Sequence, residues 1–366
     1  MAVTNWMAQQ LLHERNDALC EAYVGILEAS SSHNESLSDT IASLSSMYKT
    51  RSLFENNWKA PVRRGLPAGL KYVLRVVQSR APAVDDVAPD AAPIKTIEAF
   101  LDLAMMNLDD LVRKNHNLSS TLMKCIEDLL DSLSETSFEK LVPGVLAVLD
   151  DSERELPIQL HCRLIASLPA RTTRSYHLRR RLALDVLLPK DERRKAESSE
   201  RNWLETILKA LESGQQFNIG DATDYALLMA LINVADIAVS AGFTGYDALH
   251  PSQASSEKSS LSIYAGPPPV SQAAKIHNRQ IDAIVSELEY MKSIIQHEST
   301  SLCRQELKAA LERVTARLGT SVRTRPKPKK QIFGTERKQA HFATNMLKIA
   351  PNALDRSGAE ETESMG

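Results

Sequence analysis

The sequence DATDYALLMALINVADIAVSAG, residues 221–242, is the most apolar helical pattern in this chain of 366 residues. Acidic residues begin it and a glycine ends it, which is the usual distribution at the two ends of an α-helix. Because apolar side chains occur on nearly every side of such a helix, we expect it to be a central helix, buried on several sides. Unpaired carboxylates are rarely buried, so Asp224 is predicted in its first turn and Asp236 at an edge.

The segments on the N-terminal side of this helix repeat a helical pattern, with apolar residues three and four positions apart and short polar turns between segments. They cover residues 94–114, 117–133, 137–151, 157–168, 173–189 and 201–214. A series of this kind usually stacks as antiparallel helical hairpins.

The N-terminal region is less regular. Residues 3–29 are predicted to form one helix and residues 36–49 another, whereas prolines and a glycine interrupt residues 56–67. The short apolar run LKYVLRVVQ, residues 70–78, fits a helix or a buried strand, and a helix is favoured because nothing nearby supplies a partner strand. The Pro- and Ala-rich residues 81–93 are predicted to be a linker or a long surface loop.

Two heptad patterns follow a second linker, the Ser- and Pro-rich residues 250–270. Apolar residues recur at alternating spacings of three and four from Ile281 to Ile295 and at the same spacings from Leu307 to Leu318. Neither pattern reaches four heptads, so packing inside the chain is favoured over a coiled coil with another chain, which leaves self-association open. The sequence therefore predicts an αα-hairpin in this part of the chain.

The composition favours an all-α fold. Hydrophobic residues make up 43% of the chain, enough for a substantial core, while aromatic residues and the 13 glycines are too few for a typical β-rich protein. We predict an irregular stack of antiparallel helical hairpins, HEAT-like by analogy only, followed by the αα-hairpin and a basic, partly disordered tail. The predicted regions are residues 1–80, 81–93 (linker), 94–249, 250–270 (linker), 271–320 and 321–366.

Several features indicate an intracellular protein. The cysteines, Cys20, Cys125, Cys162 and Cys303, lie far apart and are typical of small apolar side chains in a reduced compartment. Polar and charged residues 13–15 interrupt the region that a signal peptide would need to be apolar. No stretch approaches 18 uncharged apolar residues, so no membrane span is expected. We therefore expect a nuclear or, alternatively, a cytoplasmic protein.

Motifs for catalysis are weak. The glycine loops that bind phosphates, the GxSxG elbow and the HExxH zinc motif do not occur. Asp109-Asp110 and Asp150-Asp151 are acidic pairs of the kind that bind Mg²⁺ in helical enzymes, but each lacks a further carboxylate at a suitable helical offset. The sequence therefore predicts no catalytic residue, metal or cofactor, and an all-α, magnesium-dependent enzyme is the least favoured alternative.

Charge is unevenly distributed along the chain. Residues 98–155 carry 13 acidic and 5 basic side chains, whereas residues 163–195 carry 3 acidic and 10 basic ones. These charges could neutralise each other across the helical stack, or residues 171–195 could form a basic patch for an acidic partner, a phosphoinositide or a nucleic-acid backbone. The candidate patch residues are Arg174, Arg179, Arg180, Arg181, Arg193 and Arg194.

A second concentration of positive charge, VRTRPKPKKQIFG at residues 322–334, is here called the basic segment. Its two prolines are expected to keep the chain extended and its charges solvated. Such a cluster suits an acidic groove, so recognition by a nuclear import receptor is the preferred use and contact with nucleic acid is the alternative. The two apolar side chains that follow suggest a docking element. The candidate residues are Arg323, Arg325, Lys327, Lys329, Lys330, Ile332 and Phe333.

Together these features predict a non-catalytic α-helical scaffold or adaptor in a nuclear assembly. It would bind protein partners through its helical surfaces and the basic segment. The first alternative is association with nucleic acid or chromatin through the basic residues at 171–195 and 323–338.

Overall fold

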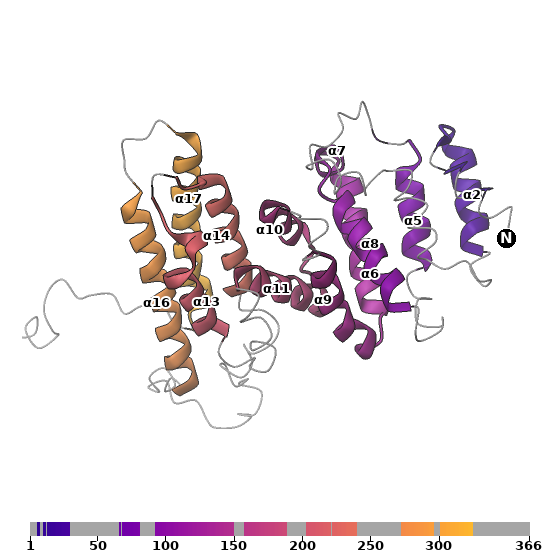
Figure 1. Ribbon diagram of the computed structural model, residues 1–366. Coiled ribbons are helices and arrows are strands. Elements are labelled where there is room, and N and C mark those ends of the chain that lie inside the picture. Colours follow the sequence, from indigo (N-terminus) through magenta and orange to yellow (C-terminus); the bar gives the residue numbers. More distant parts are fainter. Residues whose placement is uncertain are drawn as a thin grey trace, which may run out of the picture. The chain divides into compact units, whose positions relative to one another are not determined.

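The chain is all-α, as its composition and periodicity predict (Figure 1). In the computed structural model, the residues whose placement is described are 6–7, 10–11, 13–29, 66, 68–80, 92–149, 157–188, 203–220, 222–239, 272–295 and 301–324. Within these ranges there are twelve α-helices and no β-strand. The predicted helix at 36–49, most of the first linker and the whole second linker lie outside the described residues.

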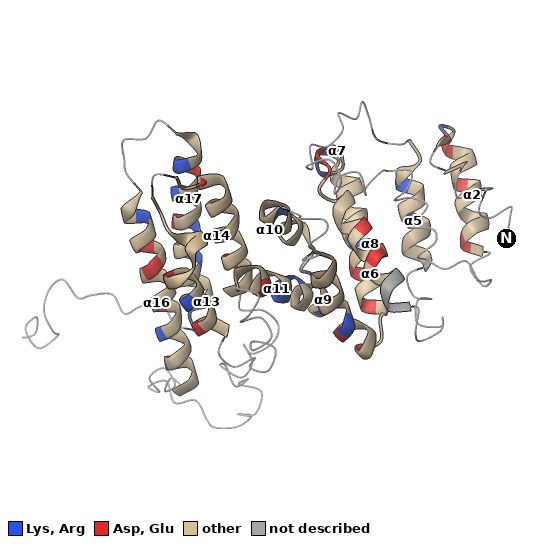
Figure 2. Ribbon diagram, viewed as in Figure 1, with Lys and Arg blue, Asp and Glu red and all other residues tan. Residues whose placement is uncertain are grey.

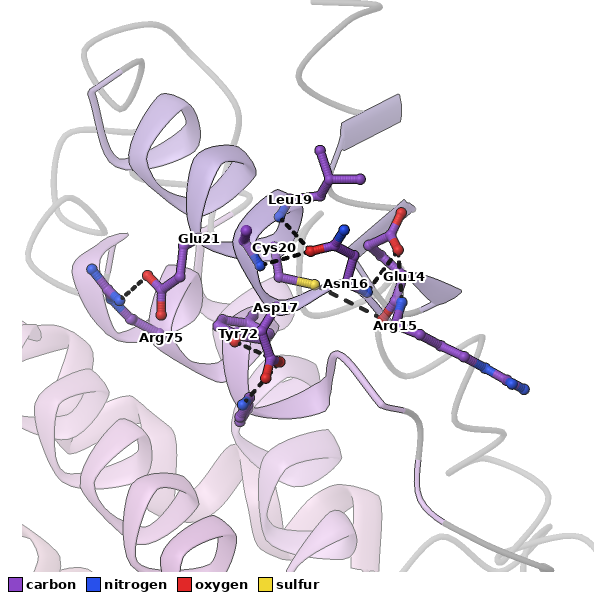
Figure 3. Close-up of polar contacts among 11 residues, drawn as sticks. Glu14, Arg15, Asn16, Asp17, Leu19, Cys20, Glu21, Tyr72 and Arg75 are labelled. Atoms are coloured by element: carbon purple, nitrogen blue, oxygen red, sulfur yellow. Dashed lines mark hydrogen bonds and ion pairs between the residues drawn. The ribbon is translucent and has the colours of Figure 1, made fainter.

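The prediction of one helix over residues 3–29 is wrong, because the chain leaves the helical conformation at residues 14–16. The side chain of Asn16 caps a new helix, α2 (Asp17–Ala29), by accepting hydrogen bonds from the backbone N–H groups of Ala18 and Leu19 at 3.0 and 3.4 Å (Figure 3). Asparagine competes with continued helix in this way because its short side chain reaches nearby backbone donors.

The apolar run after the first break forms a helix, α5 (Leu70–Arg80), as predicted. It packs on α2, and polar contacts border the apolar interface (Figure 3). The Tyr72 hydroxyl donates to Asp17 at 2.8 Å, and the Arg75 guanidinium reaches Glu21 at 2.8 Å and Glu28 at 3.1 Å. The two helices are thus joined along their length.

The predicted helix over residues 94–114 is two helices, α6 (Ala92–Met106) and α7 (Asp110–Lys114). The Asp109 side chain caps α7 by accepting from the N–H of Leu111 at 2.8 Å. Asn107 is buried in the turn and donates to the carbonyl of Ser167 at 2.7 Å. Two polar side chains therefore stop a helical pattern that the apolar residues alone would continue.

Three further helices follow the predicted segments closely: α8 (His116–Ser132), α9 (Glu135–Leu149) and α10 (Ile158–Ser167). α8 packs on α5 and α6, and α9 packs on α6. The next helix, α11 (Thr173–Leu187), contacts α8, α9, α10 and the helices that come later, so it joins the earlier and later parts of the array.

The most apolar helix is α14 (Tyr225–Val239), which follows α13 (Trp203–Ser213) and the short 3₁₀ helix η3 (Gln215–Phe217). It packs on α10, α11, α13 and α17, consistent with a helix that is apolar on most sides. Asp224 caps it, accepting from the N–H groups of Ala226 and Leu227 at 3.0 and 3.1 Å. Asp236 lies near its C-terminal end, where Arg317 donates to its carboxylate at 2.7 Å and to its carbonyl at 2.8 Å.

The two heptad patterns form a helical hairpin of α16 (Gln272–Ile294) and α17 (Leu302–Arg317), and α17 continues into a π-helical turn, η5 (Leu318–Val322). The seam residues of both helices are buried. Since α16 packs on α13 and α17, and α17 packs on α14, both seams are used inside the chain, the favoured of the two predictions (Figure 1).

Candidate functional site: where the basic segment leaves the helices

The first three residues of the basic segment lie against α16. Asn278 contacts Thr324 twice: its carbonyl oxygen accepts from the backbone N–H at 2.9 Å, and its amide nitrogen donates to the side-chain hydroxyl at 2.7 Å. His277, the residue before Asn278, also contacts the segment: its ring Nε2 lies 3.2 Å from the backbone carbonyl oxygen of Val322. With Asp282 and Arg323, described next, these residues form what we call the anchor site: His277, Asn278, Asp282, Val322, Arg323 and Thr324.

Arg323 is not the solvated cation that was predicted. Its guanidinium Nη2 lies 3.1 Å from Asp282 Oδ2, and its side chain is only 10% exposed. Its Nε and Nη1 atoms are buried without a hydrogen-bond partner. A buried guanidinium with few partners is costly unless it is paired, so the ion pair with Asp282 stabilises this position.

Packing explains why Arg323 is drawn inward. Val322, its neighbour, is buried in the core with 1% exposure, and Leu318 at the start of the π-helical turn is 0% exposed. The N–H of Arg323 donates to the carbonyl of Leu318 at 3.2 Å and closes that turn. The compact unit that contains all the described residues ends at Thr324.

The later candidates of the basic segment lie outside the described residues: Arg325, Lys327, Lys329, Lys330, Ile332 and Phe333. The structure describes the chain up to Thr324, the residue that directly precedes Arg325. The first two turns of α16, which include Asn278, also expose Lys275, Ile276 and Arg279, and Ile276 is 51% exposed. The Lys and Arg positions of the α16 ribbon are blue in Figure 2.

Three arginines of the predicted basic patch are not simply solvated, because they donate hydrogen bonds to backbone carbonyls of other helices: Arg174, Arg179 and Arg180. Arg174 donates to the carbonyls of Leu130, Asp131 and Leu133 at the C-terminal end of α8, and it also pairs with Glu135 at 3.2 Å. Carbonyl groups in the last turn of a helix have no backbone N–H partner within that helix. The guanidinium therefore completes the end of α8 and complements its dipole.

Arg179 and Arg180 do the same at two other helices. Arg179 donates to the carbonyls of Ile165 and Ala166, at the end of α10, at 3.1 and 3.2 Å. Arg180 donates to the carbonyl of Ala238, at the end of α14, at 3.3 Å, and its guanidinium stacks 4.0 Å from the Trp203 ring centroid. Burial lowers the pKa of the Arg179 guanidinium, and the negative charge of Asp236 partly offsets this effect.

The last arginine of the run, Arg181, lies 3.6 Å from the carboxylate of Asp185 on the same helix. All four arginines of α11 are half-buried. Figure 2 shows these blue positions on α11 and the red ones of the acidic α8. The remaining patch candidates, Arg193 and Arg194, lie outside the described residues.

The carboxylate pairs do not form a metal site where they are described. Asp109 caps α7, and Asp110 pairs at 4.0 Å with Arg113. Asp150 and Asp151 lie outside the described residues. Among the described residues, no three side chains of His, Cys, Asp or Glu gather as metal ligands would.

Three of the cysteines are buried and one, Cys303, is exposed. Burial raises the pKa of the Cys125 thiol to about 12 and that of the Cys162 thiol to about 12. A thiol with so high a pKa stays protonated at neutral pH and is a poor nucleophile. The prediction that the cysteines are small core side chains thus holds for the three buried ones and is wrong for Cys303, which is exposed.

The structure also has surface hollows. One of about 620 Å³ lies where α2, α5 and α8 meet, with Glu28, Arg75, Asp128 and Asp131 among its lining residues. Arg75 is already paired there with Glu28. Another, of about 520 Å³, lies beside α7 and includes Lys114 and His116.

Sequence reasoning missed the α16 half of the anchor site. His277 and Asn278 occupy buried positions on the apolar face that continues to Ile281 and Ile284. Polar side chains at such positions need hydrogen-bond partners. This was the signal that could have indicated a contact on α16.

None of the described helices is both long and apolar enough to cross a membrane. No protein-family model matches this chain, and neither a curated protein nor a solved structure is significantly similar to it.

Proposed function

We infer that this protein is a non-catalytic α-helical adaptor of a nuclear assembly, which presents the basic segment to an acidic protein partner such as a nuclear import receptor. The helical array supplies a rigid support, and the segment supplies charge and two apolar side chains. Its cations would pair with carboxylates of the partner, and Ile332 and Phe333 would enter apolar pockets.

The observation that carries this proposal is the anchor site. The first residues of the basic segment are held against α16 by Asn278, His277 and Asp282. A segment that served only as a linker would not need these contacts. Fixing one end of an extended peptide lowers the conformational entropy that it loses on binding. The anchor therefore favours recognition of the residues that follow directly after Thr324.

The arginines of α11 weigh against nucleic acid as the main partner. Arg174, Arg179 and Arg180 already donate to carbonyl oxygens of other helices. A guanidinium that is engaged in this way has fewer donors left for phosphates.

The test is affinity purification of the full chain and of variants from nuclear extract, together with imaging of a fluorescent fusion. Changing Lys327, Lys329 and Lys330 to alanine should abolish nuclear accumulation, because an acidic receptor groove reads these cations. Changing Ile332 and Phe333 to alanine should remove a specific partner while the charge of the segment is retained.

A truncation after Thr324 keeps the anchor and removes both elements, so it should reproduce both losses. The matched control is the exposed pair Lys124 and Lys140, on α8 and α9, changed to alanine. Nuclear accumulation and partner recovery that are the same for the truncated and full chains would refute the proposal. Affinity for duplex DNA that falls steeply with salt and depends on the same lysines would favour nucleic acid instead.

A further inference from the structure

We propose that one exposed side of α16 pairs with the same side of a second copy of this chain, with the two helices antiparallel. This side, here called the outer face of α16, consists of Ile276, Arg279, Ala283, Glu287 and Tyr290. None of these residues belongs to the basic segment, so the pairing goes beyond the proposed function and does not depend on it.

The outer face differs from the apolar seam that α16 uses inside the chain. The seam residues Ile281, Ile284 and Leu288 are buried. On the outer face, by contrast, Ile276 is 51% exposed and Tyr290 is 60% exposed. The helix therefore carries large apolar side chains in water in addition to those that it buries.

Helix geometry gathers the exposed apolar side chains into one stripe. Ile276, Ala283 and Tyr290 are seven positions apart, which is close to two full turns. Ile294, which is 40% exposed, follows Tyr290 after one more turn. The stripe thus runs over about 27 Å of the helix. Exposed apolar side chains that share a face in this way indicate a contact surface, whereas isolated ones do not.

The outer face is symmetric about Ala283. Ile276 and Tyr290 lie seven positions before and after it, and Arg279 and Glu287 lie four positions before and after it. When two copies pair antiparallel about this alanine, Ile276 of each copy meets Tyr290 of the other, and Arg279 meets Glu287. The small alanines meet at the centre and let the helices approach closely.

Charge selects both the occupant and the direction. A parallel pair would place the two Arg279 side chains together and the two Glu287 side chains together, and like charges that face each other weaken association. The antiparallel pair instead forms two Arg279–Glu287 contacts. The face is therefore complementary to a copy of itself in one orientation.

The environment of Glu287 agrees with this pairing. Burial, and then the negative charge of Glu212 on α13, raise the pKa of the Glu287 carboxyl, so its ionised form is unfavourable in the single chain. Arg279 is exposed. The Arg279 guanidinium of a second copy would bring positive charge to both carboxylates.

One pair of helices forms a small interface, so the association should be weak. Two helices in contact over five turns bury less than the about 1,600 Å² of a standard interface. We expect a monomer at about 1 μM and a dimer at about 100 μM, with weaker association at high salt.

Sedimentation velocity of the full chain over this concentration range tests the pairing. Arg279→Glu and Glu287→Arg each place like charges opposite one another, so each variant alone should associate at least about tenfold more weakly. An equal mixture of the two variants has opposite charges at both contacts and should recover the dimer, which misfolded variants would not do. The exposed pair Lys124 and Lys140, changed to alanine, is the control and should associate as the unchanged chain does.

Disulfide formation tests the direction. Cys303, the exposed cysteine, is first changed to serine. A mixture of an Ile276→Cys chain and a Tyr290→Cys chain should then form a mixed disulfide under mild oxidation, because antiparallel pairing brings these two positions together. Disulfides that form mainly between identical variants would show a parallel pair and overturn the inference.

Two sedimentation results would also overturn it. A chain that stays monomeric at about 100 μM has no such contact. A dimer that both charge variants leave intact must use another surface, such as the exposed Leu19 and Ile26 of α2.

Discussion

At the scale of single residues, the arginines are the most informative side chains. Arg174, Arg179, Arg180 and Arg317 each donate to a backbone carbonyl near the C-terminal end of another helix. Helix ends carry unpaired carbonyls and a partial negative charge, so a guanidinium satisfies both needs at once. A cluster of arginines in the sequence is here a set of contacts between helices.

Arg174→Ala should lower the free energy of unfolding by about 2 kcal/mol, because hydrogen bonds from a charged donor to the α8 carbonyls are lost. Arg174→Lys should recover little of this, since an ammonium group lacks the planar fork that reaches several carbonyls. Urea unfolding followed by circular dichroism measures both. If the lysine variant were as stable as the unchanged chain, charge alone would explain the contact and the geometric argument would be wrong.

Glu287 should make stability depend on pH in an unusual direction. Burial, and then the charge of Glu212, raise its pKa above the ordinary value of 4.5. Folding therefore favours the protonated form, and this contribution is present below pH 4.5 and lost as the pH rises through the raised pKa. Glu287→Gln should increase the melting temperature at pH 7 and change it little at pH 4.

Glu312 provides the contrast for that measurement. Its hydrogen bond and ion pair with Lys292, at 2.5 Å, lower its pKa. This contribution is present above the ordinary value and is lost as the pH falls. Glu312→Gln should therefore lower the melting temperature at pH 7, opposite in sign to Glu287→Gln. The same sign for both variants would show that burial does not govern Glu287.

At the scale of elements, helix ends depend on single polar side chains. Asn16, Asp109, Asn115 and Asp224 each accept a backbone N–H at a helix start. Two of these caps divide segments whose apolar pattern continues through them. This is why the helical regions could be predicted from periodicity while two of their boundaries could not.

Two glycines in or beside helices should respond oppositely to alanine. A Cβ at Gly25, within α2, would meet no atom within 4 Å, so Gly25→Ala should stabilise the protein by about 0.5–1 kcal/mol through the lower entropy of the unfolded chain. A Cβ at Gly214, after α13, would collide with the carbonyl oxygen of Ala210. Backbone cannot rotate away, so Gly214→Ala should destabilise by about 1–3 kcal/mol. Urea titration of the two variants side by side checks this, and stabilisation by both would contradict the close contact.

At the scale of the whole molecule, the compact unit ends at Thr324, in the middle of a segment that the sequence marks as one basic run. The boundary follows from Leu318 and Val322, which are buried, and from the hydrogen bonds between Asn278 and Thr324. Folding therefore uses the first residues of the basic segment, and the partner binding proposed above would use the residues that follow them.

Truncation separates these two roles. A chain that ends after Thr324 should unfold with the same midpoint as the full chain, because every described contact is kept. A chain that ends after Arg317 loses the burial of Leu318 and Val322, which should cost about 3–5 kcal/mol. Hydrogen exchange should then increase in α16 and α17. Equal stability of the two truncated chains would show that η5 and the anchor site add nothing to the fold.

The all-α class, most helical segments and the hairpin of α16 and α17 were predictable, because apolar periodicity is a local property and the core follows it. The destinations of the α11 arginines were not. Arg174 meets carbonyls more than 40 residues away, and Arg180 meets one 58 residues away. No local sequence pattern predicts which helix ends will lie beside a given guanidinium group.

The sequence by itself thus determined the all-α class, most helical segments, their apolar faces and where positive charge accumulates. Only the tertiary structure decided which of those charges are used inside the protein and that Arg323 belongs to the fold, because a long side chain is satisfied by groups that packing brings near it. Asn278 and Thr324 are 46 residues apart, and their contact exists only after two helices have paired along their apolar seams.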